Sequence, residues 1–171
     1  MNPGKEYAAM INEQNKLARQ QPFGMAWEFM PRPIAQPIQY ESDTLATLAR
    51  TNRWQLTWPI QQLFSQQEWA VIVTDRWEII QYVNPLFEQM TGYEIAEVTG
   101  RKPNFLQGRD TDLATRQRMR IAIDQQQPIK DNMLNYKKDG TKYWCNVTIF
   151  PVRNDQKQVV NYIALEQETP V

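Results

Sequence analysis

A tight turn at Asp139-Gly140 limits the folds open to this chain more than any other feature of its sequence. An Asp-Gly pair that ends a turn over 137–140, between two extended segments, is a strong signal for a β-hairpin. The flanking segments, 129–137 and 141–151, are therefore predicted to be paired antiparallel strands. After a polar loop, 159–167 is predicted to be a third strand.

Two strands and several short helices are predicted before this hairpin. Residues 70–74 form an apolar, β-branched run, and residues 78–83 are its expected hairpin partner across a turn at 75–77. The helices are predicted from Asn84-Pro85 to Gly92, over 94–98, and from Thr111 or Asp112 to a point before Pro128. This order predicts an α+β fold with a five-stranded antiparallel sheet and short helices on one face.

The chain is expected to have two parts, an N-terminal helical and proline-rich extension over 1–68 and the sheet domain over 69–171. Apolar residues within 5–20 recur at helical spacing, and this helix either packs on the domain's own sheet or forms a dimer. Four prolines within 21–41 argue against a regular element there. Short helices are expected after Ser42 or Asp43 and after Thr57.

Composition excludes several functional classes. Lys plus Arg equals Asp plus Glu at 19 each, so no basic patch for nucleic acid is expected. No apolar run approaches a membrane span, and the N-terminus lacks an apolar signal core, so a cytoplasmic protein is expected. The chain has no histidine and one cysteine, Cys145, which removes the commonest general acid–base group and any internal disulfide.

The segment Gly100-Arg101-Lys102-Pro103-Asn104-Phe105-Leu106-Gln107-Gly108 follows the predicted helices. With the preceding residues 83–93, it resembles a PAS domain, and 100–112 resembles the flavin-binding loop of the LOV branch, which senses blue light. That loop normally reads Gly-Arg-Asn-Cys-Arg-Phe-Leu-Gln-Gly. Pro103 stands where the family has the cysteine that attacks the excited flavin. The resemblance covers about 69–169 and implies the PAS fold.

The resemblance also implies non-covalent binding of FMN and roles for individual residues. The family's two phosphate-binding arginines fall on Asn104, a loss of charge, and on Arg120. The glutamine beside the ring falls on Gln107, and the first ring-edge asparagine falls on Asn135. Structural alternatives stay open: Arg120 as a surface charge, Gln107 as a loop-capping amide, and Asn135 as a partner for backbone at a strand end.

Two further positions depart from the family. Cys145 replaces the second ring-edge asparagine, and a small core residue is its expected role. Glu166 replaces the glutamine at the flavin's reactive edge. A carboxylate facing a pocket must be protonated or paired, or else the pocket is wet and holds another ligand. Alternation along the strands supports a shared inward face for Asn135, Cys145 and Glu166. Glu97 and Lys138 match a salt bridge that the family places at the rim.

The sequence therefore favours a sensory PAS module that holds FMN or another small ligand without forming a cysteinyl adduct. The alternative is a ligand-free PAS module for dimerisation or protein contacts, and a flavoenzyme is disfavoured by the lack of histidine. Apolar residues are predicted on the outward sheet face, where a homodimer or a signalling partner would bind, together with the N-terminal helices. The residues expected on this face are Val71, Val73, Leu134, Trp144, Phe150, Ile163 and Leu165.

Overall fold

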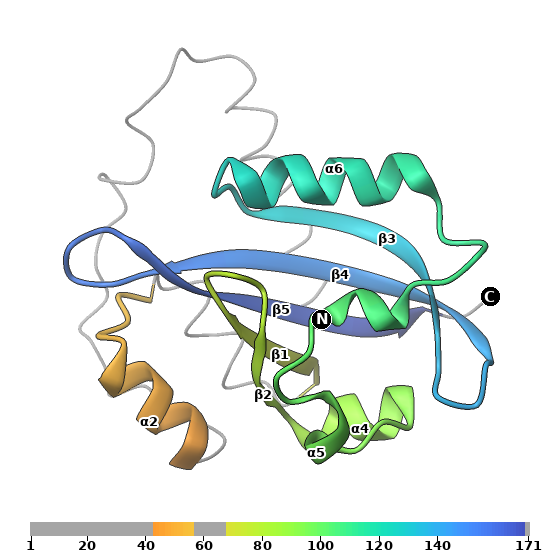
Figure 1. The fold of residues 1–171 in the computed structure, drawn as a ribbon, viewed down its shortest axis with the longest axis horizontal. Coiled ribbons are helices and arrows are strands. Elements are labelled where there is room, and N and C mark those ends of the chain that lie inside the picture. Colours follow the sequence, from red (N-terminus) through yellow and green to blue (C-terminus); the bar gives the residue numbers. More distant parts are fainter. Residues whose placement is uncertain (1–42, 57–67, 170–171) are drawn as a thin grey trace, which may run out of the picture. The chain divides into compact units, whose positions relative to one another are not determined.

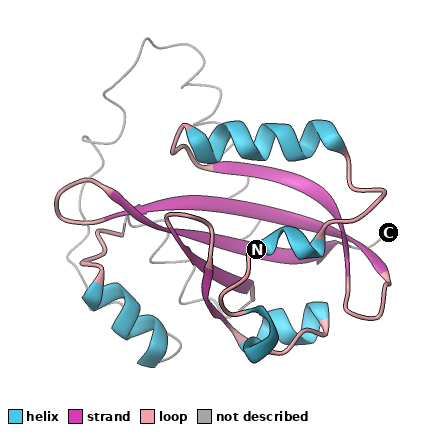
Figure 2. Ribbon diagram, viewed as in Figure 1, coloured by secondary structure: helices cyan, strands magenta, loops and turns pink. Residues whose placement is uncertain are grey.

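The structure is a computed structural model that describes residues 43–56 and 68–169. The predicted elements at 5–20, 21–41 and 57–66 lie outside these residues. The described part is an α+β domain with one sheet (Figures 1 and 2). Its strands are β1 (Ala70–Asp75), β2 (Ile80–Val83), β3 (Ile129–Tyr136), β4 (Lys142–Arg153) and β5 (Val159–Thr169).

The five strands follow the order β2-β1-β5-β4-β3, and every neighbouring pair is antiparallel. The predicted five-stranded antiparallel sheet is therefore confirmed. The helices are α2 (Asp43–Thr51), α4 (Pro85–Thr91), α5 (Ile95–Val98) and α6 (Leu113–Asp124), with a 3-10 helix at Pro103–Leu106. No helix among the described residues is long and apolar enough to cross a membrane.

The predicted helix boundaries are confirmed by their caps. The side chain of Asn84 accepts a hydrogen bond from the backbone amide of Phe87 at the start of α4, and Gly92 ends that helix at φ 76°. Asp112 accepts from the amide of Thr115 at 2.7 Å and so begins α6. Side-chain and backbone groups at each end satisfy amides or carbonyls that the helix itself leaves without partners.

The β1–β2 turn is longer than expected. β2 begins at Ile80 and not at Glu78, because Oδ1 of Asp75 accepts hydrogen bonds from the amides of Trp77 and Ile79, both at 2.9 Å. Glu78 adopts a left-handed backbone at φ 69°. This turn fixes the direction in which Glu78 leaves the sheet.

Helices α4, α5 and α6 and the 3-10 helix pack against one face of the sheet in two adjoining clusters (Figure 1). The first joins Ile72 of β1 to Phe87 of α4 and Val98 of α5. The second joins Met119 of α6 to Met133 of β3 and to β4. Ala164 of β5 contacts both clusters. The predicted placement of helices on one sheet face agrees with this core.

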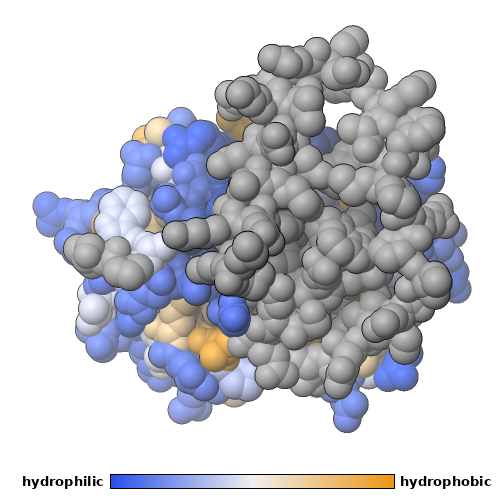
Figure 3. Space-filling view, turned by 180° about the vertical axis from the view of Figure 1, so that it is seen from behind, coloured by the Kyte–Doolittle hydropathy of each residue, from blue (hydrophilic) through white to orange (hydrophobic). Residues whose placement is uncertain are grey.

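The opposite face of the sheet carries the apolar side chains that strand alternation placed there. Val71, Val73, Phe150, Ile163 and Leu165 are all buried. Trp144 differs and is 43% exposed, because it pairs with Leu134 and Thr169 at the hairpin end of the sheet. Its expected burial by the N-terminal helices or by a second chain stays a prediction. The described surface visible in Figure 3 is mostly hydrophilic.

Residues 43–56 are joined to the sheet domain. The Trp54 indole donates to Oδ1 of Asn161 on β5 at 2.8 Å, and the backbone of Gln55 forms a bridge with Arg153 of β4. A part of the segment expected as an extension therefore contributes hydrogen bonds to the sheet.

Candidate functional site

A cavity of about 490 Å³ lies on the inner face of the sheet, beneath α6 and the 3-10 helix. This volume is within the range of small-molecule sites. Its walls are largely apolar, and they come from four strands and both helical segments. The apolar lining includes Ile72, Leu106, Met119, Met133, Val147, Ile149 and Ala164.

Two buried polar atoms in this lining have no hydrogen-bond partner in the described part of the chain. They are Oδ1 of Asn135 on β3 and Oε2 of Glu166 on β5. Both side chains are almost fully buried, at 4% and 6% exposure. A buried polar atom without a partner is costly, so such atoms point to a ligand or to water that satisfies them.

The carboxyl group of Glu166 is held toward its neutral form. Burial raises its pKa from 4.5 to about 7, and a hydrogen bond with Cys145 opposes part of this rise. Desolvation disfavours the charged form of a carboxyl group, and no cation among the described residues pairs with Glu166. Glu166 can therefore donate a hydrogen bond as an acid below neutral pH and only accept once ionised.

Cys145 lies in the core next to this site and is not among the residues that line the cavity. Its side chain is fully buried against Met133, Tyr143 and Val147. Burial and, next, the charge of Glu166 raise the pKa of the thiol. Because the thiolate is the nucleophile, this environment keeps Cys145 unreactive.

The loop 100–108 supplies the wall opposite the sheet. Gly100 and Arg101 pair with the backbone of Ile80 through two hydrogen bonds of 2.9 Å, and this pairing fixes the start of the loop. The guanidinium of Arg101 stacks over Phe105 at 4.2 Å. From the 3-10 helix and the residue after it, Pro103, Asn104 and Gln107 line the cavity.

Charged side chains surround the cavity where α6 faces the β1–β2 turn. Arg120 donates two hydrogen bonds to the carboxylate of Glu78, at 2.7 and 3.0 Å. These bonds raise the pKa of the Arg120 guanidinium. Lys102 lies 3.8 Å from the same carboxylate. Arg116, one turn earlier on α6, also lines the cavity.

Six of the seven residues predicted for the site line one cavity, and the seventh is Cys145. The six are Pro103, Asn104, Gln107, Arg120, Asn135 and Glu166. The sequence reasoning missed Glu78 and Arg116. The spacing of Arg116 and Arg120, four residues apart on one helix, was a usable signal for the second of these. The expected salt bridge between Lys138 and Glu97 forms, at 2.6 and 2.7 Å, but neither residue is among those that line the cavity.

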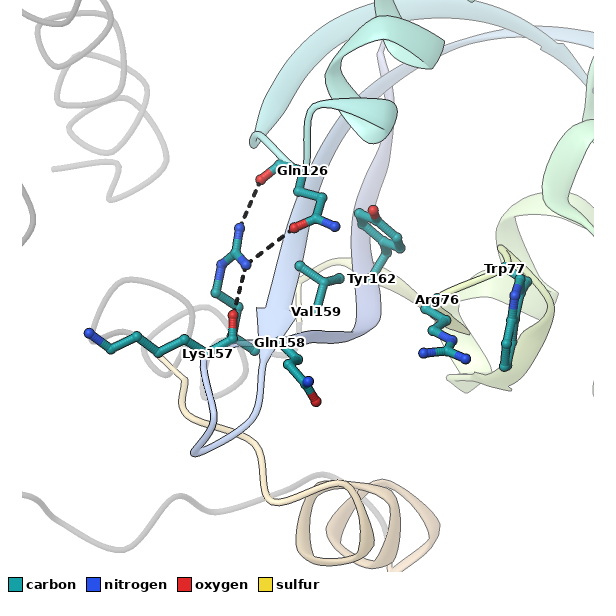
Figure 4. A pocket seen from close by; sticks show the side chains of 8 residues that line it. Arg76, Trp77, Gln126, Lys157, Gln158, Val159 and Tyr162 are labelled. Atoms are coloured by element: carbon teal, nitrogen blue, oxygen red, sulfur yellow. Dashed lines mark hydrogen bonds between the residues drawn. The ribbon is translucent and has the colours of Figure 1, made fainter. Parts of the chain in front are cut away.

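A second hollow of about 430 Å³ lies beside the β4–β5 turn (Figure 4). The Arg153 guanidinium there donates to Gln126 and to the carbonyl of Lys157, at 3.0 to 3.4 Å. Arg76 lies over the exposed ring of Trp77 at 4.1 Å. The Arg153 guanidinium is already occupied by Gln126 and Lys157, and Arg76 and Trp77 lie apart from this group in Figure 4, so the hollow is a weaker candidate than the inner cavity.

Known proteins resemble this chain over the same region. A model of the PAS domain family matches residues 67–168. Phototropin-2 of Oryza sativa subsp. japonica is 39% identical over 87 residues, which are 51% of this chain and 10% of that protein. A blue-light-activated histidine kinase of Brucella canis is 39% identical over 85 residues, 50% of this chain and 17% of the kinase. The match thus spans a small part of these relatives.

Solved LOV domains have the same fold. The LOV domain of the blue-light activated histidine kinase of Erythrobacter litoralis matches with a TM-score of 0.59 and 27% identity, covering 62% of this chain and all of that one. The dark structure of the Aureochrome1 LOV domain matches with a TM-score of 0.62 and 27% identity, covering 68% and 86%. The chain belongs to the PAS domain family, and the solved structures that it resembles are LOV domains.

Proposed function

We propose that this chain is a cytoplasmic sensory PAS domain of the LOV type that binds FMN, or a similar small ligand, non-covalently and forms no cysteinyl adduct. It acts through contacts with a second copy or a signalling partner and catalyses no reaction of its own. The observation that carries the proposal is the inner cavity, which combines apolar walls, two buried polar atoms without partners, and cations at one end.

The residues of the cavity fit a flavin. A flavin has a planar, largely apolar body, a polar ring edge that carries both donors and acceptors, and in FMN a phosphate tail. The apolar walls suit the body, while Oδ1 of Asn135 and the carboxyl group of Glu166 suit the polar edge. The amide of Gln107 adds a group that can donate and accept. When bound, the flavin would supply absorption of blue light and redox chemistry.

Pro103 lines the cavity in the position that the family gives to its reactive cysteine. Proline has no nucleophilic atom and no backbone donor. The one thiol of the chain, Cys145, is in the core with a raised pKa. These facts support a bound ligand that stays unattached to the protein. A free, buried thiol is also what a reducing compartment such as the cytoplasm allows.

A ligand-free PAS module remains the second candidate. Two residues favour it. Glu78 already forms an ion pair with Arg120, the expected phosphate-binding arginine, and Glu166 places an acidic group where the family has a glutamine that contacts the flavin. In that case the domain would act only through its surfaces. Both candidates use the exposed Trp144 on the outward sheet face for protein contacts.

Absorbance of the purified full-length chain separates the two candidates. The flavin-binding function predicts yellow protein with the structured blue-region spectrum of a bound flavin, or the same spectrum after incubation of the colourless protein with FMN and removal of free ligand. The negative control is Ala164→Trp, which fills the cavity from β5 and should abolish retention. A folded wild-type protein that retains no flavin under either condition would leave the ligand-free module as the function.

A further inference from the structure

The cations beside the cavity are not equivalent. Arg120 is fully engaged with Glu78 through two charge-assisted hydrogen bonds. Lys102 makes only a long contact of 3.8 Å with the same carboxylate. Arg116 has no ion-pair or side-chain hydrogen-bond partner in the described part of the chain, although it lines the same cavity. Arg116 is thus the cation most available to an anionic ligand group.

Glu78 is presented to Arg120 by a fixed turn. The amide of Glu78 donates to the carbonyl of Asp75 at 3.1 Å, and its left-handed backbone aims the side chain toward α6. The Glu78 side chain is only 20% exposed, against 53% for Arg120. Bidentate contacts between arginine and a carboxylate are among the stronger ion pairs in proteins. A phosphate that bound Arg120 would have to compete with this carboxylate and would be repelled by it.

Arg116 and Lys102 approach the same end of the cavity from two elements. Arg116 lies four residues before Arg120 on α6, so the two side chains leave the same face of the helix. Lys102 precedes the 3-10 helix, and Asn104 follows within it, and both line the cavity. Two cations and an amide donor therefore line one end of the cavity, and Glu78 is the lining carboxylate that contacts Lys102 and Arg120 there.

We propose, on the basis of the flavin-binding function above, that Arg116 and Lys102 bind the anionic end of the ligand and that Glu78 opposes it by holding Arg120. Glu78 is then a specificity residue that sets how strongly a phosphorylated ligand is preferred over its uncharged form. The ligand class is a planar, apolar molecule with or without a terminal phosphate. The ratio of affinities for FMN and for riboflavin, which lacks the phosphate, measures the effect directly.

The experiment titrates colourless full-length protein with FMN and with riboflavin and follows flavin fluorescence. Arg116→Gln should weaken FMN about tenfold, the size expected for one charge-assisted contact, and leave riboflavin unchanged. Glu78→Gln should strengthen FMN by a similar factor, since it removes a repelling charge and releases Arg120, and should also leave riboflavin unchanged. Arg118→Gln is the matched control, because it removes a charge from the same helix but contacts Asp131 outside the cavity.

The possible outcomes distinguish a failure of this inference from a failure of the proposed flavin-binding function. Equal effects of Arg116→Gln and Arg118→Gln on FMN would overturn the role of Arg116 alone. Weaker FMN binding in Glu78→Gln would overturn the opposing role of Glu78, since the pair with Arg120 would then help to hold the phosphate. Failure of wild type to bind either flavin would overturn the proposed function and this inference together.

Discussion

The Trp54 indole and the Asn161 amide form a buried hydrogen bond of 2.8 Å between residues that are 107 positions apart in the chain. Asn161 completes its hydrogen bonds through Nδ2, which donates to the carbonyl of Thr74 and to Oε1 of Gln81. One asparagine of β5 therefore joins the segment before the sheet domain to both strands of its first hairpin.

Trp54→Phe should lower the free energy of unfolding of the domain by about 1–3 kcal/mol, because it leaves Oδ1 of Asn161 buried without its donor. Urea unfolding of the two proteins measures the difference. Gln55→Ala is the matched control, since the exposed Gln55 contacts Arg153 through its backbone. Equal stabilities of Trp54→Phe and Gln55→Ala would show that the bond adds nothing to the domain.

The ionisation of Glu166 should make stability depend on pH. Its pKa rises from 4.5 to about 7 on folding, so the folded state binds more protons than the unfolded state between these values. Unfolding free energy should therefore fall as pH rises through this window, by about 3 kcal/mol at most. Below this pH window Glu166 makes its full contribution to the free energy of unfolding, and above the window that contribution is lost.

The measurement is urea unfolding of wild type and Glu166→Gln from pH 5 to pH 8. The chain has no histidine to titrate in this range, so the difference between the two proteins isolates Glu166. In Glu166→Gln the free energy of unfolding should no longer fall with rising pH as it does in wild type. Glu168→Gln, an exposed neighbour on the same strand, should keep the wild-type slope. A slope that persists in Glu166→Gln would mean that another group causes it.

Local sequence patterns predicted most of the fold and the inward face of the site. Asn84 and Asp112 begin helices through side-chain bonds to amides three residues ahead, and period-two alternation is enough to turn Asn135 and Glu166 to one side of the sheet. Strand alternation predicts on which face of the sheet a side chain lies, but it does not predict whether that side chain reaches the cavity. Cys145 shares that inward face yet lies outside the cavity lining.

These local patterns could not predict contacts between segments that are distant in the sequence. Glu78 and Arg120 are 42 residues apart, and neither their spacing nor their chemistry identifies them as partners in the sequence. Glu78 also lies in a turn whose left-handed backbone depends on Asp75, and a charged residue there carries no distinctive signal. The tertiary packing of α6 against the β1–β2 turn creates the pair.

Glu166→Gln should strengthen flavin retention, and the gain should grow with pH. An ionised carboxylate only accepts hydrogen bonds, whereas a glutamine amide both donates and accepts at every pH. Below the Glu166 pKa of about 7 the protonated acid can also donate, so the two proteins should then differ least. Fluorescence titration with FMN at pH 6 and pH 8 tests this. An unchanged or weaker affinity at pH 8 would argue against the contact between Glu166 and the ring.

Trp144 should become less accessible to water when the chain associates. It is the one large apolar side chain on the outward face of β4 that is exposed in the described residues, at 43%. Light scattering across a concentration series should show a dimer, and Trp144→Glu should shift it to monomer because a charge is poorly tolerated at the centre of an interface. Trp77→Glu, on an exposed turn residue, is the control. A concentration-independent monomer would remove this face as a self-association site.

Illumination should form no covalent bond between this protein and a bound flavin. Such a bond needs a thiol against the ring, and Pro103, which lines the cavity and aligns with the family's reactive cysteine, has none. Cys145 does not replace it, because its thiol is buried in the core against Met133 and Tyr143 and its raised pKa keeps it protonated. Light should therefore change the absorbance of bound flavin only when an electron donor is present.

Absorbance spectra before, during and after blue light measure this. Wild type in oxidising buffer should show no thermally reversible loss of the flavin bands, and Cys145→Ser should behave in the same way. Pro103→Cys should gain a reversible loss, since it places a thiol in the cavity wall on a loop that Gly100, Arg101 and Ile80 hold in place. A reversible change in wild type that Cys145→Ser abolishes would mean that the core opens in the light and brings this thiol to the ring.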